Sequence, residues 1–140
     1  YHHHHHHAFT GSVNLQELPL KLSELAISFN KFSGEVCLSV LPKTLKKLYL
    51  NRNLFSGPID LTKPPAIMTY LNLANNDFAG ETDFSALPRS LKMLCVSNTL
   101  LTGKVYLESK NFDFDVKQSA VEVFFGIRPD ESLIGDLFEA

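Results

Sequence analysis

Hydrophobic and polar positions recur along this chain with a period of 23 residues. In the unit from Leu45 to Ile59, which reads LKKLYLNRNLFSGPI, apolar and polar side chains alternate at Leu48, Tyr49 and Leu50. Alternation with a period of two predicts a short β-strand whose leucines point inward and whose tyrosine points outward. The pattern returns in step over four full copies, so the chain is predicted to be a repeat protein.

Each column of the repeat keeps one kind of residue. The columns are three leucine-type columns (Leu22, Leu45, Met68, Leu91; Leu25, Leu48, Leu71, Leu94; Ile27, Leu50, Leu73, Val96), an asparagine column (Asn30, Asn53, Asn76, Thr99), an aromatic column (Phe9, Phe32, Phe55, Phe78, Leu101), a glycine column (Gly11, Gly34, Gly57, Gly80, Gly103) and a proline column (Pro19, Pro42, Pro65, Pro88). Because the columns stay in step, we expect equivalent strands to lie about 4.8 Å apart in a parallel sheet that lines the concave face of a solenoid.

The columns after the strand also predict their own structure. A buried amide such as that of Asn53 is expected to bond backbone groups of its own turn and of the next repeat. The phenylalanines two residues later are expected to stack as a spine, and the glycines allow a backbone conformation that other residues resist. Apolar pairs after the glycine have a period of two, so the convex side is expected to be extended or short-turned rather than helical (Val36/Leu38, Ile59/Leu61, Thr82/Phe84, Val105/Leu107).

The residues Leu45, Leu48, Leu50, Asn53 and Phe55 form L-x-x-L-x-L-x-x-N-x-[LF], which Ser-Gly-x-Ile follows. In this pattern the chain resembles the leucine-rich repeat family, whose units span about 20–29 residues. The Ser-Gly-x-Ile part is similar to plant-type repeats, Leu-Pro-x-x-Leu before the strand looks like bacterial effector repeats, and 23-residue units resemble arrays in protists, kinetoplastids among them. The resemblance implies a mostly β, curved right-handed solenoid used in protein recognition, with one partial and four full repeats over 8–107.

The fifth cycle departs from the repeat. Asn111 stands where proline is due, and Phe114 and Lys117 stand at leucine positions. The alternation from Phe112 to Val116 predicts one more strand with a charged outer face, and the apolar run from 121 to 125 follows it. Asp130 can cap a short helix over 130–140 with an apolar stripe of Leu133, Ile134, Leu137 and Phe138. We therefore expect 108–140 to be a C-terminal cap that covers the open end of the stack.

The first seven residues are predicted to be a purification tag, because Tyr1 precedes the histidine run His2 to His7. Residues 8–16 match the back half of a repeat whose front half would fall on the tag. We expect the chain to be a fragment of a larger protein.

Charge and cysteine usage narrow the classes of protein. Residues 8–105 hold ten Lys or Arg against seven Asp or Glu, whereas 106–140 hold three against eight. This is not the concentrated basic surface of a nucleic-acid-binding protein, and no apolar run reaches the roughly 18 residues of a membrane helix. Cys37 and Cys95 fall at different points of the cycle, and two free thiols favour an intracellular, cytoplasmic location. A secreted or surface form stays the alternative.

No catalytic arrangement is predicted. All histidines lie in the tag, which excludes Ser-His and Cys-His pairs from the rest of the chain. Asp60 and Asp83 are equivalent by repeat and are expected to be structural, and nothing basic adjoins Cys95 to lower its pKa. We expect a non-enzymatic protein with no cofactor and no metal site.

The candidate partner-binding residues are the outward positions of the middle strands: Lys47, Tyr49, Asn51, Arg52, Tyr70, Asn72 and Met93. Tyrosine and arginine dominate binding hot spots because they give large contact areas. The alternative is that these are ordinary solvated strand residues. A second candidate is a basic flank of Lys43, Lys46, Arg89 and Lys92, whose alternative is a solubilising edge.

The predicted function is a monomeric protein–protein interaction module that binds a protein partner on the concave sheet face. Two alternatives stay open. The chain could be the recognition arm of a larger enzyme, such as a kinase or ubiquitin ligase, or an architectural segment of a scaffold.

Overall fold

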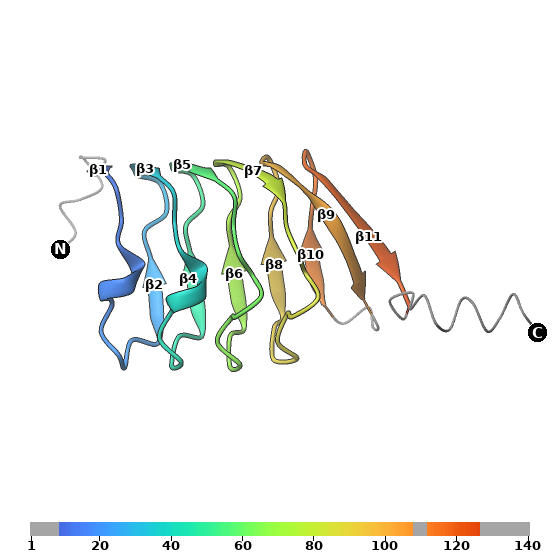
Figure 1. Ribbon diagram of the computed structural model, residues 1–140, viewed down its shortest axis with the longest axis horizontal. Coiled ribbons are helices and arrows are strands. Elements are labelled where there is room, and N and C mark those ends of the chain that lie inside the picture. The colour runs from blue at the N-terminus through green and yellow to red at the C-terminus, as the bar shows by residue number, and fades with distance from the viewer. Residues whose placement is uncertain (1–8, 108–111, 127–140) are drawn as a thin grey trace, which may run out of the picture.

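The computed structural model of the chain describes residues 9–107 and 112–126. These residues are mostly β, and two parallel sheets stack as a solenoid of about five turns (Figure 1). The helical structure in the described ranges is confined to two short 3-10 helices, η2 (Leu15–Glu17) and η3 (Leu38–Val40). The mostly β repeat architecture expected from the 23-residue period is confirmed.

The first sheet contains the short strands that the leucine columns predict. Its order is β2 (Glu24–Ala26), β4 (Lys47–Tyr49), β6 (Tyr70–Asn72), β8 (Met93–Cys95) and β10 (Asp113–Asp115), and all neighbours are parallel. Leu48, Leu71 and Leu94 at the strand centres are at most 1% exposed. We call this the short-strand sheet; its outer face is the one expected to be concave.

A second parallel sheet was not predicted from the pattern. It contains β1 (Thr10–Gly11), β3 (Lys31–Gly34), β5 (Leu54–Gly57), β7 (Asp77–Glu81), β9 (Leu100–Leu107) and β11 (Ala120–Phe125), in that order. The strands from β3 to β9 of this sheet contain residues of the aromatic and glycine columns. Glycine is unfavourable inside strands, so the residue pattern predicts a turn at these positions. In the structure, the same positions of successive turns pair with one another as parallel strands.

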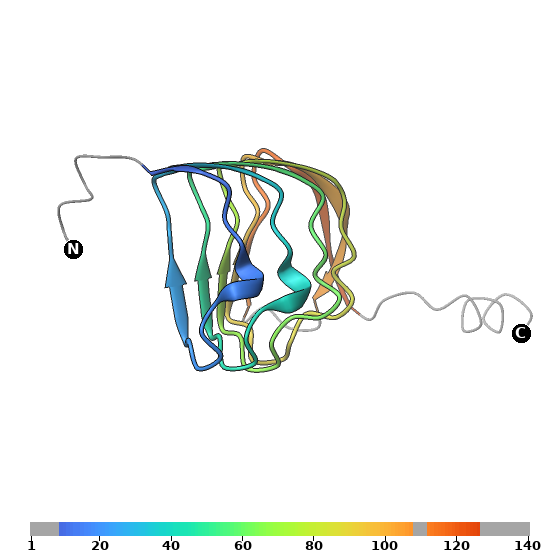
Figure 2. The same ribbon diagram turned by 60° about the vertical axis from the view of Figure 1, so that its left-hand side comes forward.

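The side of the coil opposite the short-strand sheet is built from the 3-10 helices and tight turns in the earlier turns, and β9 and β11 extend onto it in the last turns (Figure 2). Asn14 caps η2 by accepting a hydrogen bond from the Gln16 amide at 2.9 Å. Asp60 and Asp83 cap their turns in the same way, by accepting a hydrogen bond from the amide two residues later. They lie one and two repeats after Cys37. An extended or short-turned side is therefore confirmed for the described turns.

The asparagines of the asparagine column form hydrogen bonds between adjacent turns. The Asn76 amide nitrogen donates to the carbonyls of Leu73 and Ala74 in its own turn and of Leu50 in the preceding turn, and its Oδ1 accepts from the Phe55 amide at 3.1 Å. Asn53 repeats these contacts one turn earlier. The expectation that these asparagines bond the next repeat is wrong, because their side chains bond the preceding repeat.

The phenylalanine spine is confirmed. The rings of Phe9, Phe32, Phe55 and Phe78 stack in succession, with centroids 6.3, 6.4 and 6.0 Å apart. The glycine column is also confirmed at its most demanding position, Gly103, where φ is +138° and a Cβ would lie 2.5 Å from the Thr82 carbonyl oxygen. Only glycine permits this approach.

The last turn is three residues shorter than the others. Phe114 pairs with Leu94, 20 residues earlier, whereas Leu94 pairs with Leu71, 23 residues earlier. The assignment of Phe114 to the column of Leu91 and of Lys117 to the column of Leu94 is therefore wrong: Phe114 occupies the column of Leu94, and Lys117 lies beyond the strand. A fixed period cannot reveal a deletion inside the connection from β9 to β10.

The described part of the expected C-terminal cap continues both sheets, since β10 lies beside β8 and β11 beside β9. The strand expected around Phe114 and the apolar run at 121–125 are thereby confirmed as strands. The predicted helix over 130–140 and the tag at 1–7 lie outside the described residues. The proposed boundary between 107 and 108 also falls at a range outside them.

Candidate partner-binding surface

The short-strand sheet brings five of the expected binding residues onto one face. Strand register places Lys47, Tyr70 and Met93 in one row, and it places Tyr49 beside Asn72 in the next row. All five side chains are half-buried. Outward strand positions that are partly covered by their neighbours form a continuous surface rather than a set of separate solvated chains.

A cation–π contact orders the centre of this face. The Lys47 Nζ atom lies 5.2 Å from the centroid of the Tyr70 ring on the adjacent strand. Such contacts contribute about 0.5–1 kcal/mol at exposed sites. The contact restricts two long side chains before any partner binds, which lowers the entropy cost of binding.

Asn51 and Arg52 do not lie on a strand. β4 ends at Tyr49, and Arg52 has a φ of 58°, in the left-handed region. The expectation that Arg52 is an outward strand residue is therefore wrong. Its guanidinium lies 5.2 Å from the ring centroid of Phe29, and Asn51 Oδ1 accepts a hydrogen bond from the Ser28 hydroxyl at 2.8 Å. Arg52 stands at the end of the face and reaches toward the first turn.

The left-handed residue recurs in each turn, directly before the asparagine column. Phe29, Asn75 and Asn98 have φ values of 60°, 57° and 51°. Asparagine adopts this conformation more readily than most residues, and Asn98 also donates to Asn75 Oδ1 at 2.7 Å. A strained turn position followed by a buried amide is thus part of the repeat, which explains why Arg52 lies where it does.

Two acidic residues border the face at its C-terminal side. β10 places Asp113 beside Met93 and Asp115 beside Cys95. The sequence pattern predicts a charged outer face for this strand, but it does not indicate that the strand joins the short-strand sheet beside β8. The three-residue shortening hid that neighbour relation. The surface therefore has a cationic and aromatic centre and an acidic border.

The thiols lie on different sides of the coil. Cys95 is half-buried on the short-strand sheet, and its Sγ lies 3.3 Å from the Ser97 hydroxyl. Cys37 is exposed in the turn-capping column, where hydrogen bonds with Ser39 lower the pKa of its thiol. In the same column, hydrogen bonds from the Thr62 hydroxyl and amide lower the pKa of the Asp60 carboxyl. The expected structural role of Asp60 and Asp83 in turns is confirmed.

The basic flank does not form one continuous patch. Lys43 and Lys46 belong to one turn, Arg89 and Lys92 lie two turns further on, and the equivalent positions between them are Ala66 and Thr69. Arg89 and Lys92 instead line a cavity of about 830 Å³ at the last turns, which none of the expected partner-binding residues lines. The four residues are therefore two separate pairs of charges.

Within residues 9–107 and 112–126, no group of three or more histidine, cysteine or acidic side chains is placed to hold a metal ion. No helix in the same ranges has the length and apolar character needed to cross a membrane.

No protein-family model matches the chain, and no curated protein sequence matches it.

Proposed function

We propose that the chain is a leucine-rich repeat solenoid that binds a protein partner through the outer face of the short-strand sheet. The observation that supports this most is the row of Lys47, Tyr70 and Met93, flanked by Tyr49 and Asn72, in strand register on one face. Tyrosine combines a large contact area with few rotatable bonds, and it is enriched in the residues that dominate binding energy. The repeat columns support the proposed leucine-rich repeat family, because they follow the pattern L-x-x-L-x-L-x-x-N-x-[LF].

The proposed module is monomeric, intracellular and without catalytic activity. Arg52 supplies a cation at the end of the face, and Asp113 and Asp115 supply negative charge at its other border. A partner that fits this surface presents apolar or aromatic groups to the tyrosines. It also presents basic groups toward the acidic border, because complementary charge sets orientation and association rate.

The test is a comparison of captured partners. The triple variant Tyr49→Ala/Arg52→Ala/Tyr70→Ala should retain at least about tenfold less of each partner protein, since single hot-spot residues contribute about 2 kcal/mol or more to the binding free energy. The matched control is Lys63→Ala/Glu81→Ala/Ser85→Ala, three exposed residues away from the short-strand sheet. Quantitative mass spectrometry of proteins retained by each immobilised chain provides the measurement, after circular dichroism shows that both variants are folded.

Partners that bind the triple variant and the wild-type chain equally would contradict the proposal. The recognition-arm alternative predicts the same loss of binding, but it requires a catalytic domain in the longer chain, which sequencing on either side of this segment would reveal. The scaffold alternative predicts that no partner depends on Tyr49, Arg52 or Tyr70.

A further inference from the structure

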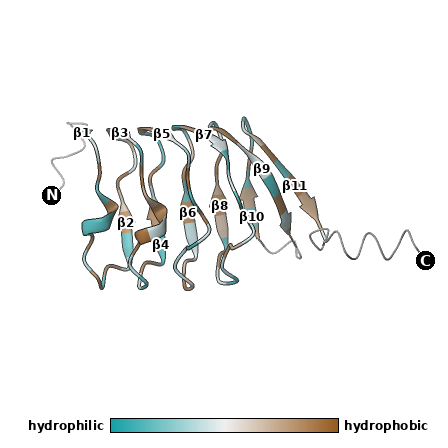
Figure 3. Ribbon diagram, in the orientation of Figure 1, coloured by the Kyte–Doolittle hydropathy of each residue, from teal (hydrophilic) through white to brown (hydrophobic). Residues whose placement is uncertain are grey.

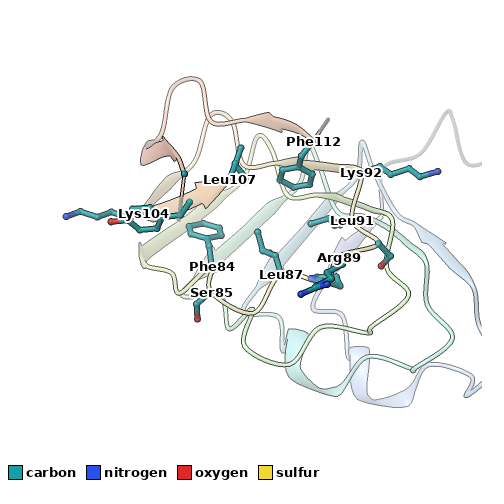
Figure 4. Close-up of a pocket in the computed structure, with 13 residues that line it drawn as sticks. Phe84, Ser85, Leu87, Arg89, Leu91, Lys92, Lys104, Leu107 and Phe112 are labelled. Carbon is teal, nitrogen blue, oxygen red and sulfur yellow. The ribbon is translucent and has the colours of Figure 1, made fainter. Parts of the chain in front are cut away.

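A cavity of about 830 Å³ opens between the fourth turn and the last one. Phe84, Leu87, Leu91, Leu107 and Phe112 supply its apolar wall. In Figure 4, Phe84, Leu87 and Leu107 surround the hollow together with Phe112. The volume lies within the roughly 300–1,000 Å³ of cavities that bind ligands in proteins.

The cavity arises from the short last turn. In the second and third full turns the loop before the strand is covered by the corresponding loop of the next turn, so Leu45 and Met68 are 0% and 1% exposed. The last connection lacks three residues, and the equivalent Leu91 is 8% exposed. Pro42 and Pro65 are likewise buried, whereas Pro88 is only half-buried. A surface that the repeat is built to cover is left partly open at this position.

The rim of the cavity is cationic. Arg89, Lys92 and Lys104 line it, and no acidic side chain is among the described residues that do so. Lys92 and Lys104 extend at opposite sides of the hollow in Figure 4. An apolar floor with a positive rim is complementary to a peptide segment that is apolar on one side and acidic on the other.

The neighbouring strand adds further apolar surface. β11 is the last strand of its sheet and is largely hydrophobic in Figure 3, and its Phe124 and Phe125 are 39% and 65% exposed. A second cavity of about 340 Å³, bordered by Phe114, Val123 and Phe125, shares Leu107 and Phe112 with the first. The two cavities are therefore parts of one apolar surface around Phe112.

We propose that residues 127–140 of the same chain bind in this cavity. The segment begins directly after Gly126, which itself lines the cavity and donates its amide hydrogen to the Leu107 carbonyl at 2.9 Å. Its sequence supplies the complementary groups: the apolar residues are Leu133, Ile134, Leu137 and Phe138, and the acidic residues are Asp130, Glu131, Asp136 and Glu139.

The length of residues 127–140 and their attachment next to the cavity favour this segment over a separate peptide. The fourteen residues from 127 to 140 would span about 21 Å even as a continuous helix, at roughly 1.5 Å per residue. A segment tethered at the edge of its own site has an effective concentration of about millimolar. The contact does not depend on the partner-binding proposal, because none of the expected partner-binding residues lines the cavity.

The test uses the full chain with Cys37→Ser and Cys95→Ser, and with a nitroxide attached at Ser132→Cys. Ser132 is polar and lies outside the apolar stripe, so the label leaves the proposed contact intact. We expect the label to reduce the NMR amide intensities of residues 84–92 and 104–107, with no loss across β4 and β6. Adding Lys104→Glu should restore part of that intensity, whereas the control Lys63→Glu, at an exposed lysine elsewhere, should not.

Two results would overturn the proposal. One is that intensities around the cavity are the same with the nitroxide oxidised and reduced. The other is that the loss is just as large when spin-labelled chain without isotope label is mixed with isotope-labelled chain without the nitroxide, which would assign the cavity to a second copy.

Discussion

At the scale of single residues, Thr82 places a hydroxyl group in a repeat column that is otherwise apolar. The column holds Val36, Ile59 and Val105 in the other turns, and Thr82 is 3% exposed. Its Oγ1 is buried and, among the described residues, has no hydrogen-bond partner. A hydroxyl in this state has lost its water without gaining a protein acceptor.

We predict that Thr82→Val raises the free energy of unfolding by about 1–2 kcal/mol, because valine has nearly the same shape and removes the unpaired hydroxyl. Urea denaturation measures the change. Thr102→Val, at an exposed position, is the control and should shift stability by less than about 0.5 kcal/mol. A loss of stability in Thr82→Val would show that the hydroxyl is paired in solution.

At the scale of elements, hydrogen bonds between turns differ along the asparagine column. Asn76 bonds backbone groups of its own turn and of the preceding one. Thr99 is too short to do both: its hydroxyl donates to the Val96 carbonyl and accepts from the Leu101 amide, both in its own turn. Ser119 repeats the pattern of Thr99 in the last turn. The coupling between turns therefore changes after the third full repeat.

Asn76→Ala should lower the free energy of unfolding by about 3 kcal/mol or more, because each buried group left unpaired costs about 1–3 kcal/mol. Thr99→Ala should cost about 1–2 kcal/mol, since fewer groups lose a partner. Both values come from urea denaturation under the same conditions. Equal losses in the two variants would contradict the view that Asn76 connects adjacent turns and Thr99 does not.

At the scale of the whole molecule, burial differs from turn to turn along the solenoid. Leu71 in β6 and Leu73 directly after it are 1% and 0% exposed, whereas Leu25 in β2 and Ile27 directly after it are only half-buried. In repeat architectures each turn contacts only its neighbours, so stability follows these local contacts. The backbone bond is the same at both places: Ile27 donates to Tyr49 at 3.0 Å and Leu73 donates to Cys95 at 2.8 Å.

Amide hydrogen exchange should therefore be at least about tenfold slower at Leu73 than at Ile27, which corresponds to about 1.4 kcal/mol. The two amides make equivalent hydrogen bonds, so the difference reports packing of the turns rather than bond geometry. Equal protection at the two sites would mean that the solenoid opens only as one unit.

Much of the fold and of the candidate surface could be predicted from the residues that recur every 23 positions. The leucine columns predict the parallel short-strand sheet, and the aromatic column predicts the stacked rings. Outward positions such as Tyr49 and Tyr70 follow from the same alternation, and the structure places them on adjacent strands. The residue pattern predicts that Arg52 lies on the strand, whereas its positive φ places it in the turn after the strand.

The repeat, the inward columns and the order of turns follow from the residues alone, because stacking imposes the same residue type at every equivalent place. The second sheet, the hydrogen bonds of the asparagines to the preceding turn and the cavity around Phe112 follow only from the folded chain. Each of these depends on which groups from different turns meet in space. The three-residue shortening shows the reason: it changes which surface is covered, while the residues on either side still resemble the repeat.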